Sequence, residues 1–288
     1  MILSELGGYF EILLLVLVLI GLPDTFETKP HFEQWVLAAR SFPPSGGTVA
    51  VMFGVDDMTT VSIHQPTYLP WAGFFQKLHE CEIFIVLDNV QLPKNNRGSW
   101  ANRTRLLCNG NPLWLTVPLV RPRGLQRIDE ARQVANTWKK QHRESIHQWY
   151  RTSRYYSMLS DFLDELYDLP TPFIGEFDLL AIEIILKQIE SCDFNKIVMA
   201  SSLPVTSSST QRLVDLIRQV GGTKYLSGRG SDGYLDQSMF ERAGIELEYQ
   251  KFVERERPQL GVTGFVEGLS IIDSLLNVGV EQTNSYLQ

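Results

Sequence analysis

The segment that most constrains this chain of 288 residues is Val61–Trp71, which reads V-S-I-H-Q-P-T-Y-L-P-W. Its first residues are typical of a β-strand, and they run directly into a rigid turn that contains His64 and two prolines. An apolar periodic pattern from Phe74 predicts a helix, and residues 82–87 predict a second strand that ends at Asp88. Ligands of α/β proteins often bind where parallel strands end. We therefore expect a site that includes His64; the alternative is a histidine that only completes the turn.

The rest of the chain alternates between strand and helix patterns. An Asn-Gly-Asn-Pro sequence at 109–112 separates two strand patterns and predicts an antiparallel hairpin. Residues 136–190 hold only helical patterns. Short strands with a helix between them are then predicted at 196–200, 224–227 and 246–252. This order predicts an α/β fold with a mostly parallel, Rossmann-like sheet, flanking helices and an all-helical insertion at about 136–190.

The first 57 residues differ in character from the remainder of the chain. Residues 12–22 form an apolar run of eleven residues, which is short for a membrane span of roughly 20 residues. No basic residue precedes this run, so it does not resemble a secretory signal. We expect residues 58–288 to form the α/β domain and residues 1–57 to be an extension outside the fold, with Met58 as the natural start. The alternative is a genuine N-terminal anchor helix.

Charge and cysteine content narrow the class of protein. The net charge is −7, yet residues 94–154 carry thirteen lysines and arginines against three acidic residues. This basic segment predicts a lobe that meets an anionic ligand such as phosphate, or else a solvated helical face. The chain shows no nucleic-acid-binding motif, and its three widely spaced cysteines favour a reducing, cytoplasmic compartment. The scattered histidines predict no metal site, and no cofactor is indicated.

Two features of the middle and end of the chain are suited to anions. Arg103 and Arg105 lie two apart on a predicted strand, so both guanidinium groups can face one ligand. They could equally be solvent-facing arginines on an edge strand. The predicted strand at 224–227 runs into a glycine-rich turn, whose backbone N–H groups would suit phosphate. A flexible surface loop is the alternative for this turn.

The predicted helix from residue 136 carries a histidine on its apolar stripe. The stripe consists of Trp138, His142, Ile146 and Tyr150, spaced four residues apart. Such a stripe is usually core, so His142 is either a packed residue with one hydrogen bond or a second candidate base.

With these residues located, residues 59–281 resemble the WbqC-like family of bacterial proteins. The resemblance is carried by H-Q-P-T-Y-L-P-W-A-G-F-F at 64–75, Asp88 with Gln91, W-A-N-R-T-R at 100–105, the helix with Trp138, Lys139, His142 and Tyr150, Y-L-S-G at 225–228 with Tyr234, and L-S-I-I-D-S-L-L-N-V-G at 269–279. One departure is Arg257, which stands where the family often has an aromatic residue before Pro-Gln-Leu.

The resemblance implies a role in the synthesis of O-antigen and other surface polysaccharides. It suggests a transferase that moves an amino-acid group, with glycine suggested, or another acyl group to a nucleotide-linked or other anionic sugar. Two alternatives are a nucleotidyltransferase-like, adenylate-forming enzyme, although the paired H-x-G-H residues are missing, and a non-catalytic sugar-binding accessory protein.

These considerations assign expected roles to individual residues. His64 would act as general base, Asp88 would orient it or bind a sugar hydroxyl, and His142 is the second candidate base. The residues expected to bind substrate are Gln65, Tyr68, Trp71, Gln91, Trp100, Asn102, Arg103, Arg105, Ser227, Gly228, Tyr234, Asp273 and Asn277.

Overall fold

The structure is a computed structural model that describes residues 58–92, 99–120, 124–135, 137–189, 194–231, 233 and 235–287. The expected extension at 1–57 and the expected ligand contact of Tyr234 lie outside the described residues.

A five-stranded parallel sheet forms the centre of the domain. Its strands are β1 (Thr60–His64), β2 (Ile83–Val86), β5 (Ile197–Met199), β6 (Lys224–Ser227) and β7 (Glu246–Tyr249), in the order β5-β2-β1-β6-β7. The middle of β1 and most of β2 are buried, as the apolar character of these strands requires when helices cover both faces. The predicted parallel, Rossmann-like sheet is thus confirmed.

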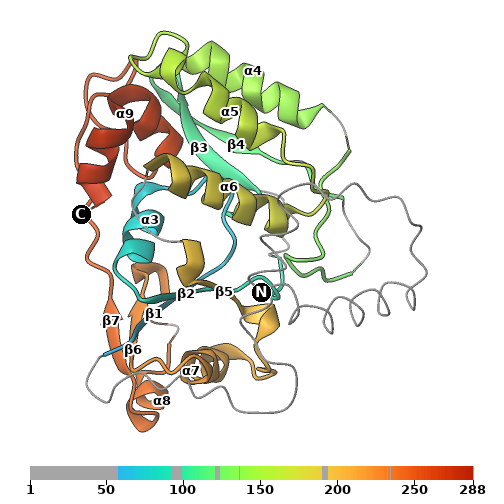
Figure 1. The fold of residues 1–288 in the computed structure, drawn as a ribbon, viewed down its shortest axis with the longest axis vertical. Helices are drawn as coiled ribbons and strands as arrows, with labels where there is room; N and C mark the ends of the chain where they lie inside the picture. The colour runs from blue at the N-terminus through green and yellow to red at the C-terminus, as the bar shows by residue number, and fades with distance from the viewer. Residues whose placement is uncertain are drawn as a thin grey trace, which may run out of the picture. The chain divides into compact units, whose positions relative to one another are not determined.

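Helices connect the strands and cover the two faces of the sheet. Helix α3 (Ala72–His79) joins β1 to β2, α7 (Ser209–Gln219) joins β5 to β6, and α8 (Gln237–Arg242) joins β6 to β7. Figure 1 shows α7 and α8 on one face and α3 on the other. Each face has its own apolar cluster, and the cluster on the α3 face is the larger of the two.

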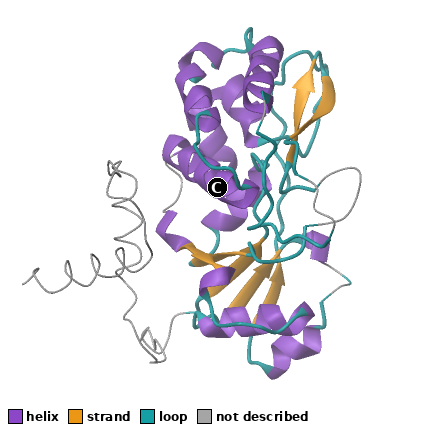
Figure 2. Cartoon of the chain, turned by 90° about the vertical axis from the view of Figure 1, so that its right-hand side faces the viewer, coloured by secondary structure: helices purple, strands orange, loops and turns teal. Residues whose placement is uncertain are grey.

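The long connection between β2 and β5 holds a hairpin followed by helices. The hairpin pairs β3 (Arg103–Cys108) with β4 (Asn111–Thr116), and Figure 2 shows it apart from the main sheet. Its turn places Asn109 and Gly110 at φ 50° and 77°, the left-handed geometry that an Asn-Gly pair favours. Helices α4 (Trp138–Tyr150), α5 (Ser160–Tyr167) and α6 (Ile174–Ile189) form the predicted helical insertion. Short 3-10 turns are η1 (Tyr156–Met158), η2 (Phe194–Lys196), η3 (Ala200–Ser202) and η4 (Arg229–Ser231).

The last helix, α9 (Ile271–Leu287), packs against α3 and α6. It kinks at Gly279, which has φ 84°. A Cβ at this position would lie 2.7 Å from the ring of Tyr155, so both the backbone and the packing favour glycine. The helix resumes beyond this glycine instead of ending there. Across the described ranges, the structure holds no helix that combines the length and apolarity needed to cross a membrane.

Candidate functional site

The strand order places one reversal point in the sheet. From β1 the chain moves outward through β2 to β5, then returns to β6 beside β1 and continues to β7. The connections therefore leave β1 and β6 in opposite directions, and the carboxyl ends of these two strands are the usual ligand position in such sheets. His64 is the last residue of β1. Ser227 is the last residue of β6, and Gly228 follows it. The structure thus brings three of the predicted site residues to this reversal point.

His64 is half-buried and held in one orientation. Its Nδ1 lies 2.9 Å from the carbonyl oxygen of Gln65, which can only accept, so Nδ1 carries the proton and Nε2 the lone pair. The rings of Trp71 and Phe74 pack edge-on against it at 5.6 and 5.2 Å. Burial, followed by the charge of Lys77, lowers the pKa of His64 to about 3. The imidazole is therefore neutral near pH 7, and with a pKa this low it is a weak proton acceptor in the unliganded protein.

Lys77 is a second polar group at this point, and the sequence did not single it out. It lies on the buried face of α3, is 2% exposed, and donates from Nζ to the carbonyl oxygen of Ile63 at 3.3 Å. Its Nζ also lies 3.9 Å from the position that a Cβ on Gly228 would occupy. Burial lowers the pKa of Lys77 to about 8. The available signal was a lysine within the apolar pattern that starts at Phe74.

A series of aromatic rings leads outward from His64. Trp71 packs against Trp100 at 5.1 Å between ring centroids, and Trp100 against Trp114 at 5.3 Å. Trp100 and Trp114 are 43% and 42% exposed, which is unusual for side chains of this size. We call Trp71, Trp100 and Trp114 the tryptophan series. Trp114, on β4, was absent from the predicted site, because its approach to Trp100 depends on how the hairpin folds back.

The two predicted arginines extend this surface. The guanidinium of Arg103 lies 3.9 Å from the Trp114 ring centroid, and that of Arg105 lies 5.9 Å from it. Both arginines therefore share the face of β3 that meets Trp114, as their spacing predicted. Arginine stacked on an aromatic ring keeps its N–H donors directed sideways, where they can bind an anion.

Asp88 and Gln91 follow β2 at the same edge of the sheet. The Asp88 carboxylate is buried and accepts a hydrogen bond from the Ser201 backbone N–H at 3.0 Å. The Gln65 carbonyl, rather than Asp88, contacts Nδ1 of His64. Gln91 is exposed and pairs through its backbone with Arg127. Binding of a sugar hydroxyl by Asp88 or Gln91 stays a prediction.

Tyr68 and His142 meet in the core. The hydroxyl of Tyr68 lies 2.9 Å from Nδ1 of His142 and 2.9 Å from the hydroxyl of Tyr167. Burial lowers the pKa of His142 to about 4, while a hydrogen bond with the Thr116 backbone acts in the opposite direction. These contacts fit the interpretation of His142 as a packed core histidine, and they anchor the turn after β1 to the helical insertion.

Asn102 has a structural role in positioning the tryptophan series. Its Oδ1 accepts from the Ser99 N–H at 2.8 Å, and its Nδ2 donates to the Val117 carbonyl at 3.0 Å. In the same turn, the Trp100 carbonyl accepts from the Tyr68 N–H at 2.8 Å. Asn102 therefore fixes the backbone that presents Trp100.

Asp273 and Asn277 lie within a network of buried side chains on and before α9. Asp273 accepts from Tyr150 at 2.9 Å, from Gln259 at 3.2 Å and from Asn277 at 3.0 Å, and its carboxylate lies 3.5 Å from Arg257. Burial raises the pKa of Asp273, and Arg257 opposes the rise. The network joins α9 to α4 and to the segment 254–259 that precedes α9, so Arg257 takes part in contacts that hold the fold together.

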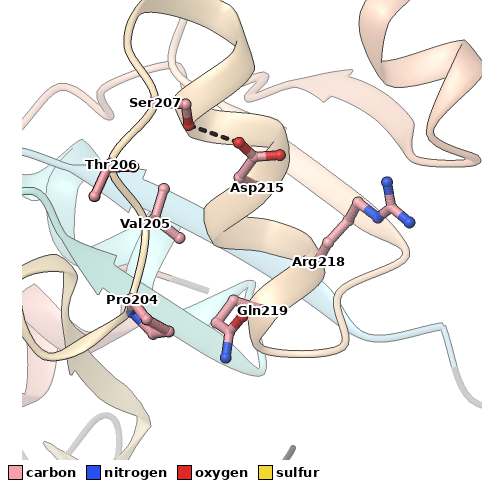
Figure 3. Close-up of a pocket in the computed structure, with 7 residues that line it drawn as sticks. All are labelled: Pro204, Val205, Thr206, Ser207, Asp215, Arg218 and Gln219. Carbon is pink, nitrogen blue, oxygen red and sulfur yellow. Dashed lines mark hydrogen bonds between the residues drawn. The ribbon is translucent and has the colours of Figure 1, made fainter.

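A surface hollow of about 390 Å³ lies elsewhere, along α7. It is lined by Pro204, Val205, Thr206, Ser207, Asp215, Arg218 and Gln219. Figure 3 shows Ser207 directed at Asp215; its Oγ donates at 2.6 Å, and Gln211 donates to the other carboxylate oxygen at 2.7 Å. The residues that line the hollow include none of those at the ends of β1 and β6. The hollow is therefore not part of the candidate site.

The fold defines an α/β protein with a five-stranded parallel sheet whose strand order reverses between β1 and β6. In the described part of the chain, no group of three or more His, Cys, Asp or Glu side chains is placed to hold a metal ion. Residues 65–285 match the model of the WbqC-like protein family, and the chain belongs to that family. It is 27% identical over 234 residues to the uncharacterized protein Rv1507c of Mycobacterium tuberculosis, an alignment that covers 78% of this chain and 96% of the relative. No solved structure matches the chain.

Proposed function

We propose that the protein transfers an amino-acid or other acyl group to a nucleotide-linked or other anionic sugar, within surface-polysaccharide synthesis. The observation that carries the proposal is the continuity between His64 and the tryptophan series. A neutral imidazole with an available lone pair lies at the reversal point of the sheet, and exposed rings and arginines lead away from it. This combination supports our proposal that an unprotonated imidazole acts beside a surface suited to a long, partly anionic and partly cyclic ligand.

The proposed chemistry uses His64 as general base. An activated acyl donor, such as an acyl thioester or acyl adenylate, supplies the carbonyl carbon. The sugar hydroxyl or amine attacks this carbon and its proton passes to Nε2 of His64, while the donor's leaving group departs with the bonding electron pair. The Gln65 carbonyl fixes the tautomer that this step requires, because it holds the proton on Nδ1.

The surface around Trp114 fits the rest of the ligand. Aromatic faces stack on sugar rings and nucleobases, and each stacked base contributes about 1–3 kcal/mol. Arg103 and Arg105 on the same strand face can bind the diphosphate that links a nucleotide to its sugar. The tryptophan series therefore supports a sugar carried on a nucleotide more than a free sugar.

The sheet itself supports a second candidate, adenylate formation before transfer. The order β5-β2-β1-β6-β7 is the arrangement in which many α/β proteins bind nucleotides at the reversal point. In this version ATP would bind at the reversal point, and the acyl group would be activated there with release of pyrophosphate before it reaches the sugar.

A thermal-shift screen of the full chain tests these proposals. The ligands are ATP, nucleotide-linked sugars, acyl-coenzyme A, free amino acids and free sugars, and a ligand that binds the native state raises the unfolding midpoint. A rise with nucleotide-linked sugars supports the first proposal, and a rise with ATP supports the second. A rise with free sugars alone would contradict both and favour a sugar-binding accessory protein.

A histidine variant then separates binding from chemistry. His64→Gln keeps a polar side chain but removes the basic nitrogen, so we expect turnover with the stabilising pair of donor and acceptor to fall by about 10²–10⁴-fold, with ligand binding largely kept. His79→Gln is the matched control, because His79 is exposed at the far end of α3. Unchanged turnover in His64→Gln would show that His64 is not the base.

A further inference from the structure

Lys77 is a buried cation without an acidic partner among the described residues. Its side chain is 2% exposed, and its hydrogen bond to the Ile63 carbonyl engages one of the three ammonium protons. The Phe84 ring, 5.7 Å away, supplies a further weak attraction. A buried ammonium is costly unless it is paired with an anion. The ion pairs within the described ranges leave Lys77 out.

The position of the ammonium is defined by three elements. Helix α3 runs from the carboxyl edge of the sheet toward the other edge, and side chains on a helix point back toward its N-terminus. The Lys77 side chain is thereby directed toward the carboxyl edge, where Ile63 lies near the end of β1. Gly228, directly after β6, borders it on the other side. The ammonium thus lies between the two strand ends that form the reversal point.

The glycine at position 228 leaves the neighbourhood of the ammonium open on one side. Apart from the two residues next to Gly228 in the chain, Lys77 Nζ is the one described atom within 4 Å of the position that a Cβ on Gly228 would take, at 3.9 Å. A side chain at position 228 would extend toward the ammonium, and glycine has none. A ligand oxygen could take this position next to the lysine.

We infer that the Lys77 ammonium binds a phosphoryl group of the ligand at the reversal point, between the end of β1 and Gly228. The inference rests on the proposed function for the identity of the ligand, and it adds the group that holds the ligand's charge beside His64. Lys77 lies at the sheet edge beside His64, whereas Arg103 and Arg105 lie on the hairpin. A phosphoryl group here would supply the anion that the buried ammonium lacks.

The test is isothermal titration of inorganic pyrophosphate into the full chain at pH 7.0. We expect Lys77→Met to bind pyrophosphate at least tenfold more weakly than the wild type. Lys196→Met is the matched control, because Lys196 also donates to a backbone carbonyl, that of Cys81 at 2.9 Å, but lies before β5 at the opposite edge. We expect it to bind as the wild type does. Circular dichroism confirms that each variant is folded.

Gly228→Ala gives a second, independent reading. The added Cβ lies at ordinary contact distance from Nζ, so the variant should fold, but it fills the space that the phosphoryl oxygen would use. We expect severalfold weaker pyrophosphate binding. If Lys77→Met and Gly228→Ala both bind pyrophosphate as the wild type does, or if the wild type binds none, the inference is wrong. Binding of acetate in place of pyrophosphate would also overturn it, in favour of a carboxylate ligand.

The outcome separates this inference from the proposed function. A nucleotide-linked sugar that stabilises Lys77→Met as strongly as the wild type would leave the role of His64 standing and remove that of Lys77. If pyrophosphate binding depends on Lys77 but nucleotide-linked sugars do not stabilise the protein, the role of Lys77 stands and the proposed function falls.

Discussion

Replacing Lys77 by methionine should stabilise the unliganded protein at neutral pH. Methionine has a similar length and no charge, so it removes a buried ammonium from an apolar surrounding. Burial lowers the pKa of Lys77 from 10.5 to about 8, and each tenfold change in proton affinity corresponds to about 1.4 kcal/mol. The charged lysine therefore destabilises the folded state by about 3 kcal/mol at pH 7, and we expect Lys77→Met to recover most of this free energy of unfolding.

The destabilisation by Lys77 should decrease as the pH rises. Below pH 8 the lysine is charged in both the folded and the unfolded chain, so the full destabilisation is present. Between pH 8 and 10.5 the unfolded chain binds the proton more tightly, so the wild type gains stability as the pH rises. Among the described residues, His64 and Cys81 interact with the charge of Lys77. Both are mostly neutral in this range, because the pKa of His64 is lowered to about 3 and that of Cys81 is raised to about 11.

Urea unfolding of both proteins, followed by tryptophan fluorescence at pH 7.0, 8.5 and 10.0, measures the difference directly. We expect the free energy of unfolding of Lys77→Met to exceed that of the wild type by about 3 kcal/mol at pH 7.0 and by under about 1 kcal/mol at pH 10.0. Other alkaline titrations occur in both proteins and cancel in the comparison. A variant that is less stable than the wild type at pH 7.0, or a difference that does not change with pH, would refute this account of Lys77.

Three further predictions concern the surroundings of the site. Trp114→Ala should weaken binding of the stabilising nucleotide-linked sugar by roughly tenfold in titration calorimetry. The free energy of unfolding should change by under about 1 kcal/mol, because the ring is partly exposed. Unchanged affinity would show that Trp114 is not part of the binding surface. Gly73→Ala places a Cβ 2.6 Å from the Phe252 ring and should cost about 1–3 kcal/mol in urea unfolding; no loss would mean that the ring moves freely. Arg257→Ala leaves the Glu254 and Asp273 carboxylates without their buried cation, so it should lower the free energy of unfolding by about 3–5 kcal/mol and lower the thermal midpoint. A loss under about 1 kcal/mol would show that these ion pairs do not stabilise the fold.

Local patterns in the sequence predicted much of this fold. The strand before His64, the Asn-Gly turn at 109–110 and the buried stripe of α4 each depend on residues close together in the chain, and each is confirmed. The stripe also showed why His142 is packed: the four predicted positions are the buried residues of that helix. Periodicity is a strong signal because the backbone geometry itself imposes it.

The contacts that define the site depend instead on residues far apart in the chain. Lys77 looked like an ordinary helix residue, because a sequence does not show which strand end a lysine will reach. Trp114 meets Trp100 through the fold of the hairpin. Asp273, expected at the ligand, bonds to Tyr150 across 123 positions of sequence. Burial of a polar residue and the identity of its partner both emerge from tertiary packing, which no local pattern contains.

We propose that an anionic sugar ligand binds at the reversal point of the sheet. The decisive experiment is a crystal structure of the full chain with the nucleotide-linked sugar that gives the largest thermal shift. We expect a phosphoryl oxygen within hydrogen-bond distance of Lys77 Nζ, and the accepting group of the sugar beside Nε2 of His64. Ligand found instead in the hollow along α7, lined by Asp215 and Arg218, would contradict the claim.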